Sequence, residues 1–69
     1  MTLGQRIRLV REDAGMSREM LDAVIGLTPG TMERIETGVE VPPPSVQKAI
    51  ARSLRVTALE FFEEKDGGT

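Results

Sequence analysis

Few residues in this chain have side chains that could carry out chemistry, and their types limit what that chemistry can be. The sequence contains no cysteine and no histidine, which excludes disulfides, thiol nucleophiles, zinc fingers and imidazole acid–base catalysis. It also lacks a nucleophile–base pair, a metal-ligating cluster and a phosphate-binding glycine loop, and its scattered carboxylates are typical of solvated helix surfaces. We therefore expect no enzyme, no metal and no other cofactor.

Recognition by charged side chains is what remains, and the charge balance restricts it. Nine Lys and Arg stand against eleven Asp and Glu, for a net charge of −2. Residues 60–69 hold four of the acidic groups and one lysine, so residues 1–59 hold eight basic and seven acidic groups, a balance of 8 − 7 = +1. A nonspecific nucleic-acid binder is expected to be strongly basic. Binding to an anionic partner must therefore depend on a local arrangement of charge.

Apolar residues at helical spacing, bounded by glycines, divide the chain into short helices. In the first helix the apolar residues repeat at spacings of four and three (Leu3, Ile7 and Val10), and Gly15 follows as a stop signal. Ser17 is the expected N-cap of a second helix, which Gly26 ends. The apolar positions of this second helix are Leu21, Val24 and Ile25.

The stretch LTPGTMERIETG (27–38) predicts a third helix over residues 28–37. Thr28 is the expected N-cap, and Pro29 falls at the first helical position, where its missing N–H costs nothing. Met32 and Ile35 form the expected buried stripe, and Gly38 ends the helix.

The rest of the chain predicts a stiff connector and two further helices. Residues 39–45 contain three prolines and cannot form the interior of a helix. A fourth helix is indicated by apolar residues spaced by four (Val46, Ile50 and Leu54), and Thr57 opens a short fifth with Phe61 and Phe62. No strand pattern or repeat appears, so we expect an all-α fold of five short helices over 1–63 and a flexible acidic, Gly-containing tail over 64–69. No apolar run approaches the roughly 20 residues of a membrane span, and no signal peptide is evident, which favours the cytoplasm.

The junction between the second and third helices is expected to comprise only residues 26–28, which would make the two helices cross steeply. The chain here resembles the phage-repressor/Cro-like (XRE-type) helix-turn-helix family, over about residues 3–62. LGQRIRLVRE (3–12) is similar to the first helix of that family, GMSREMLDAVIGLTPGTMERIETG (15–38) to its central motif, and SLRVTALEFF (53–62) to its closing helices. The resemblance implies a lambda-repressor-like fold and a DNA-binding transcriptional regulator. It also implies a homodimer on a palindromic operator, with the third helix in the major groove of double-stranded DNA.

The resemblance places a small set of residues on the DNA-binding face. Arg34 would carry most of the direct base reading, and Arg18 would bind a phosphate. Glu33 would accept a hydrogen bond from a cytosine or remain solvated. Gly30 offers no side chain but lets the backbone approach the groove. Residues 39–41 lack the basic groups that relatives often carry in this loop. The complete expected set is Arg18, Thr28, Gly30, Thr31, Glu33, Arg34 and Thr37.

Two further expectations concern charges inside the fold. Arg11 and Glu36 match a family pair in which an arginine late in the first helix meets a glutamate that ends the third. Asp22 stands where the family usually has alanine. The second helix approaches the third at this position. The Asp22 carboxylate must therefore point to solvent or accept a hydrogen bond, for example from the N–H groups at the start of the third helix.

A protein-interaction module with weak or no DNA binding is the alternative reading. Met20 and Val24 lie one turn apart on the expected outer side of the second helix, where the family is mostly polar, and such residues can mark a surface for a protein partner. Leu59 is also apolar at a position that the family leaves exposed. We expect Leu59 to lie in the homodimer interface.

Overall fold

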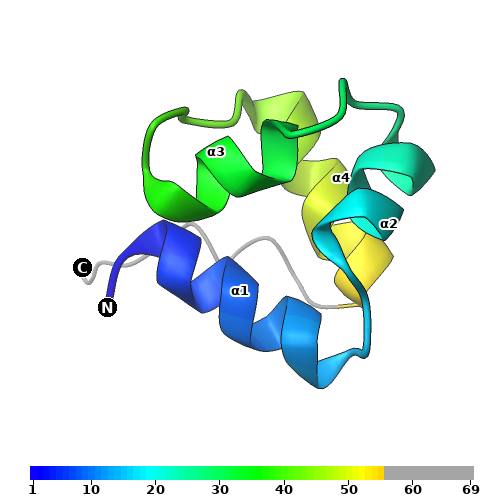
Figure 1. The fold of residues 1–69 in the computed structure, drawn as a ribbon, viewed down its shortest axis with the longest axis horizontal. Helices are drawn as coiled ribbons and strands as arrows, with labels where there is room; N and C mark the ends of the chain where they lie inside the picture. Colours follow the sequence, from blue (N-terminus) through cyan, green and yellow to red (C-terminus); the bar gives the residue numbers. More distant parts are fainter. Residues whose placement is uncertain (56–69) are drawn as a thin grey trace.

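The structure, a computed structural model, describes residues 1–55, and this part of the chain is built from helices alone. Its four helices are α1 (Leu3–Asp13), α2 (Arg18–Ile25), α3 (Thr31–Thr37) and α4 (Pro44–Leu54) (Figure 1). The all-α expectation is therefore confirmed for the described residues, with four helices there instead of the five expected in all. The expected fifth helix lies outside the described residues, together with Leu59, Phe61 and Phe62.

Side-chain caps and left-handed glycines fix the ends of the first two helices. Thr2 and Gln5 form a reciprocal capping box at the start of α1, with N···O distances of 2.8 and 3.1 Å. The Ser17 hydroxyl accepts from the Met20 N–H at 3.0 Å and starts α2 as expected. Gly26 ends α2 with φ of 87°, a conformation that only glycine adopts without strain.

The turn between α2 and α3 is longer than the sequence suggested. Thr28 does not cap α3 and Pro29 is not its first residue, because α3 begins at Thr31. Residues 28–31 instead form a turn closed by the Thr31 N–H donating to the Thr28 carbonyl at 3.1 Å, with Gly30 at φ 91° and ψ −7°. These are the angles of the third residue of a type II turn, for which Pro-Gly is the preferred central pair. That preference outweighs the tendency of proline to start a helix.

The proline-rich connector is shorter than expected, because its last proline fits the first turn of a helix. α4 begins at Pro44 and includes Ser45, so the expected connector of residues 39–45 loses its last two residues to the helix. Pro44 occupies the first turn, where a missing N–H leaves no hydrogen bond unmade.

The core lies where the four helices meet. α1 packs against α3, and α2 packs against both α3 and α4 (Figure 1). Each helix contributes one side chain that solvent does not reach: Ile7, Leu21, Met32 and Ile50. Ile35 and Leu54 are buried beside them, as the periodicity predicted. Val24, the third apolar residue of α2, lies outside this core, since its side chain is 66% exposed, as expected for the outer side of that helix.

Gly4 allows α1 and α3 to approach very closely. A Cβ atom at this position would overlap the carbonyl oxygen of Glu36, and it would lie 2.6 Å from the Glu36 carbonyl carbon and 2.8 Å from the Ile35 oxygen. The obstructing atoms are all backbone, so no side chain can rotate away to make room. The contact between these two helices therefore requires glycine at position 4.

Candidate nucleic-acid interface

Asp22 joins α2 to the start of α3. Its side chain is buried, and Oδ2 accepts from the Gly30 N–H and Oδ1 from the Met32 N–H, both at 3.0 Å. These backbone donors at the start of a helix have no partner within the helix and favour negative charge. Of the two arrangements considered for Asp22, the structure shows the inward one, in which the carboxylate fixes the position of α3 relative to α2.

A second carboxylate, Glu36, holds α3 from the side of α1. Arg11 donates to it in bidentate fashion, from Nε to Oε2 at 2.6 Å and from Nη2 to Oε1 at 3.1 Å. Arg11 Nη1 also donates to the Met16 carbonyl at 2.8 Å. The hydrogen bond to Glu36 raises the pKa of the Arg11 guanidinium above its ordinary value, against the opposing effect of burial. The two side chains named for this pair thus lie together inside the protein.

Arg18 contacts the same carboxylate. Its Nε donates to Glu36 Oε1 at 3.0 Å, while a third of its side chain stays exposed. The sequence indicated a phosphate ligand at the start of α2 and gave no sign of this contact. A phosphate that binds Arg18 must therefore use the donors that Glu36 leaves available, or displace the contact.

Arg34 also has two partners within the protein. Its Nε donates to Glu40 Oε1 at 3.0 Å, and its Nη2 donates to the Thr31 hydroxyl at 3.1 Å. Both charged side chains are well exposed, at 45% for Arg34 and 37% for Glu40. The expected reader of bases is therefore at the surface, but its position is already set by neighbouring residues.

The hydroxyl groups of the expected DNA face are largely occupied by the backbone. Thr31 is buried, and its hydroxyl donates to the Thr28 carbonyl at 2.7 Å. The Thr37 hydroxyl donates to the Glu33 carbonyl at 2.9 Å. Thr28 and Glu33 are exposed. Of this set, Glu33 and Arg34 therefore offer the most prominent side chains to an incoming partner.

The segment that carries these residues is acidic. Residues 17–41 contain two arginines and five acidic residues, a balance of 2 − 5 = −3. Each arginine contacts a carboxylate: Arg18 contacts Glu36, and Arg34 contacts Glu40. Compensated charges attract polyanions weakly, so nonspecific attraction to phosphates is small at this surface.

Several large apolar side chains are exposed at other places. Met20 and Val24 are 50% and 66% exposed on α2, which keeps the outer face of that helix apolar as the alternative reading requires. Val39 and Val41, on either side of Glu40, are more exposed still.

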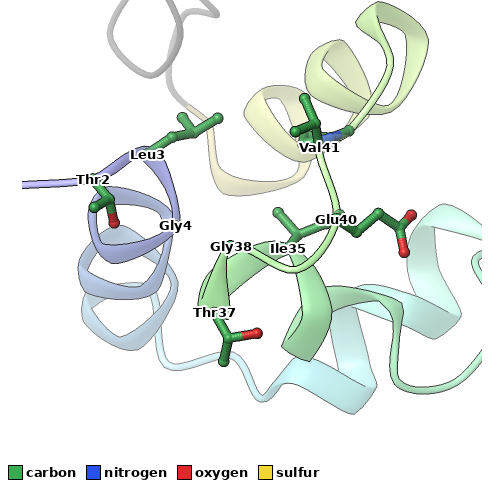
Figure 2. Close-up of a pocket in the computed structure, with 9 residues that line it drawn as sticks. Thr2, Leu3, Gly4, Ile35, Thr37, Gly38, Glu40 and Val41 are labelled. Atoms are coloured by element: carbon green, nitrogen blue, oxygen red, sulfur yellow. The ribbon is translucent and has the colours of Figure 1, made fainter.

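A small apolar hollow lies behind the loop that carries Glu40. Its volume is about 180 Å³, and it is lined by the start of α1, the end of α3 and the loop, including Leu3, Ile35 and Val41. Figure 2 shows the Glu40 side chain pointing away from Leu3 and Gly4, and Glu40 is itself one of the residues that line the hollow. The loop thus closes one side of the hollow and directs the Glu40 side chain away from the start of α1.

The contact between Glu40 and Arg34 was not anticipated, although the sequence held a signal for it. Gly38 at φ 85° reverses the chain, and the Val39 N–H then donates to the Arg34 carbonyl at 2.9 Å while the Gly38 N–H donates to that of Ile35 at 3.2 Å. This is the Schellman arrangement, which is common where glycine ends a helix. It returns the next residues to the last turn of α3, and the next charged residue is Glu40.

Comparison with known proteins supports the same fold. No curated protein sequence is similar enough to count as a relative. The family model described as a helix-turn-helix domain does match, over residues 2–61, and this family suggests a DNA-binding regulator. In residues 1–55, none of the helices has the length and apolar character needed to cross a membrane. Since the match covers most of the 69 residues, the chain belongs to the helix-turn-helix domain family.

Proposed function

We propose that the protein is a small sequence-specific DNA-binding transcriptional regulator of the Cro-like (XRE) kind, acting in the cytoplasm without catalysis and placing α3 in the major groove. The observation that carries the proposal is how α3 is held. Asp22 and Glu36 attach it from its inner side through buried contacts, while Glu33 and Arg34 remain exposed on its outer side. A helix fixed in this way can present side chains to base edges at a constant angle.

Arg34 is the proposed base-reading residue. A guanidinium can donate two parallel hydrogen bonds to O6 and N7 of guanine, a contact worth about 1–3 kcal/mol of discrimination. Arg18 is the proposed phosphate ligand, at the start of α2, and phosphate contacts orient a protein on DNA without reading its sequence.

The two arginines should therefore fail differently when each is replaced by alanine. Arg34→Ala should lose affinity mainly for the preferred site and flatten discrimination at one base pair. Arg18→Ala should weaken binding to all sequences alike and lower the slope of log K against log salt by about one for each phosphate that the variant no longer binds. The measurement is a salt titration of binding to a site selected from random DNA and to unrelated DNA.

Glu33→Gln completes this series. Removing the exposed charge should tighten binding to unrelated DNA, unless the carboxylate accepts from a cytosine, in which case one further base pair loses discrimination. If Arg34→Ala binds every DNA as the unmodified protein does, α3 is not the reading helix. Absence of binding even at low salt would contradict the proposed function itself.

Dimerisation is the second part of the proposal. One α3 helix contacts too few base pairs for useful affinity, so two copies are expected on a palindromic operator, with their reading helices about 34–36 Å apart. Leu59, outside the described residues, is the proposed apolar anchor. Leu59→Glu should convert a dimer to a monomer in sedimentation at micromolar concentration. A monomeric unmodified protein, or a mutant that stays dimeric, would contradict this arrangement.

A protein-interaction module is the second candidate function, and the exposure of Met20 and Val24 favours it. Its distinguishing test is a Met20→Ser, Val24→Ser double variant. This variant should bind DNA normally if α3 is the functional surface, and should lose a protein partner if the outer face of α2 is.

A further inference from the structure

We propose that Glu40 is a positioning residue that determines the specificity of Arg34. It orients the guanidinium before DNA arrives, and it cancels the charge that would otherwise attract any phosphate. This inference rests on the proposed function. It assigns to Glu40 a role that a basic residue at this position could not perform.

The backbone places Glu40 for this contact. The Arg34 carbonyl accepts from the N–H groups of Val39 and Glu40 at 2.9 and 3.1 Å, and the Glu40 carboxylate accepts from Arg34 Nε at 3.0 Å. Glu40 is thus connected to Arg34 through its main chain and its side chain together. Figure 2 shows its carboxylate directed away from α1.

The contacts of Arg34 use one edge of its guanidinium and leave the other available. A guanidinium has five N–H donors, of which Nε serves Glu40 and one on Nη2 serves Thr31. The remaining donors on Nη1 and Nη2 include the parallel pair at the end of the fork, which suits the two acceptors of a guanine. A Cβ atom on Gly30 would lie 3.4 Å from Nη1, so the guanidinium of Arg34 lies beside the N-cap residue of α3.

The charge of Glu40 has a separate effect. Arg34 and Glu40 together are neutral, and an exposed ion pair of this kind adds little to folding stability. Its effect on binding is larger. An arginine whose charge is already balanced by a carboxylate is attracted only weakly to a phosphate, and its remaining N–H donors stay available for a base. Glu40 thereby lowers affinity for unrelated DNA and preserves discrimination at the base pair that Arg34 contacts.

The test compares Glu40→Gln with Glu12→Gln, a control that removes the carboxylate of another exposed ion pair, the one with Arg8 on α1. Binding is measured on a site selected from random DNA by the unmodified protein, and on its single-base-pair variants, at several salt concentrations. Glu40→Gln should bind all sequences more tightly, with a salt slope steeper by about one. It should also lose about tenfold discrimination at the base pair read by Arg34. Glu12→Gln should keep discrimination at every base pair.

The outcomes separate this inference from the proposed function. If the unmodified protein discriminates and Glu40→Gln discriminates equally well at every base pair, Glu40 does not position Arg34, and the proposed function stands. If the unmodified protein binds no DNA, the proposed function fails and this inference with it. A further measurement needs no DNA: exchange of the Arg34 Nε proton with solvent should be slow in the unmodified protein and faster in Glu40→Gln. Equal exchange rates would overturn the positioning role.

Discussion

Glu36→Ala is expected to lower the free energy of unfolding by about 3–5 kcal/mol, the range for removing one partner of a buried ion pair. The carboxylate is 1% exposed and accepts hydrogen bonds from both Arg11 and Arg18. Without it, Arg11 keeps the part-buried Met16 carbonyl as an acceptor and the half-exposed Glu12 carboxylate at 3.9 Å. A domain typically has a total stability of roughly 0.05–0.15 kcal/mol per residue, so the loss is a large part of the stability of this small domain. In a urea titration the variant should therefore unfold at much lower urea concentration than the unmodified protein.

The partner substitution should cost less. In Arg11→Ala, Glu36 still has Arg18 as a cationic donor at 3.0 Å, so its charge is not left alone. The double variant should be destabilised by less than the sum of the two single effects. Once Glu36 is gone, Arg11 has already lost its ion-pair partner, so removing Arg11 as well costs less than it does in the unmodified protein. Strict additivity would show that the pair does not couple. Glu12→Ala is the control: its carboxylate is 50% exposed and pairs with Arg8 on the surface of α1, and its removal should change stability by about 0.5 kcal/mol or less.

Gly4→Ala should destabilise the protein by about 3 kcal/mol or more, at or above the upper end for overpacking a core. Propensity alone predicts the opposite sign, since alanine in a helix is favoured over glycine by about 0.5–1 kcal/mol. The added methyl group would meet the backbone of Ile35 and Glu36, so α1 would have to move away from α3. Such a movement would also lengthen the contact between Arg11 and Glu36.

Gly15→Ala is the matched control for this prediction. Gly15 lies in the left-handed region at φ 73° and has no atom within 4 Å of an added Cβ. Its substitution should cost only the backbone strain, about 1 kcal/mol. Thermal unfolding of the two variants gives the comparison, with about 4–8 °C expected per kcal/mol for a domain of this size. Equal destabilisation at the two positions would contradict the steric explanation for Gly4.

Helix positions were predictable because they depend on neighbouring residues. Gly26 and Gly38 end α2 and α3 where the sequence predicted, since both adopt the left-handed conformation that glycine favours. The start of α3 was missed because Pro29 satisfies two local preferences, and the adjacent Gly30 decides between them. The Pro-Gly pair is itself a turn signal in the sequence, and here it outweighs the tendency of proline to begin a helix.

Side-chain partners were predictable only where charge and geometry left few choices. For Asp22 the sequence left two arrangements, one toward solvent and one toward the N–H groups that begin α3, and the second is the one found. The contacts of Arg18 with Glu36 and of Arg34 with Glu40 were missed, because they depend on how α1, α2 and the loop after α3 meet in space. Gly4 offered a weak signal, as an isolated glycine within a helical pattern, but the sequence does not show which backbone lies opposite to it.

The hydrogen bonds from Gly30 and Met32 to Asp22 also bear on the thermodynamics of binding. They hold the first turn of α3 in the unbound protein, so this seven-residue helix, too short to be stable alone, does not have to order itself on a partner. Ordering of flexible segments is a cost that otherwise reduces affinity. Association should therefore occur as the docking of a rigid surface, without the heat-capacity change that accompanies folding on binding.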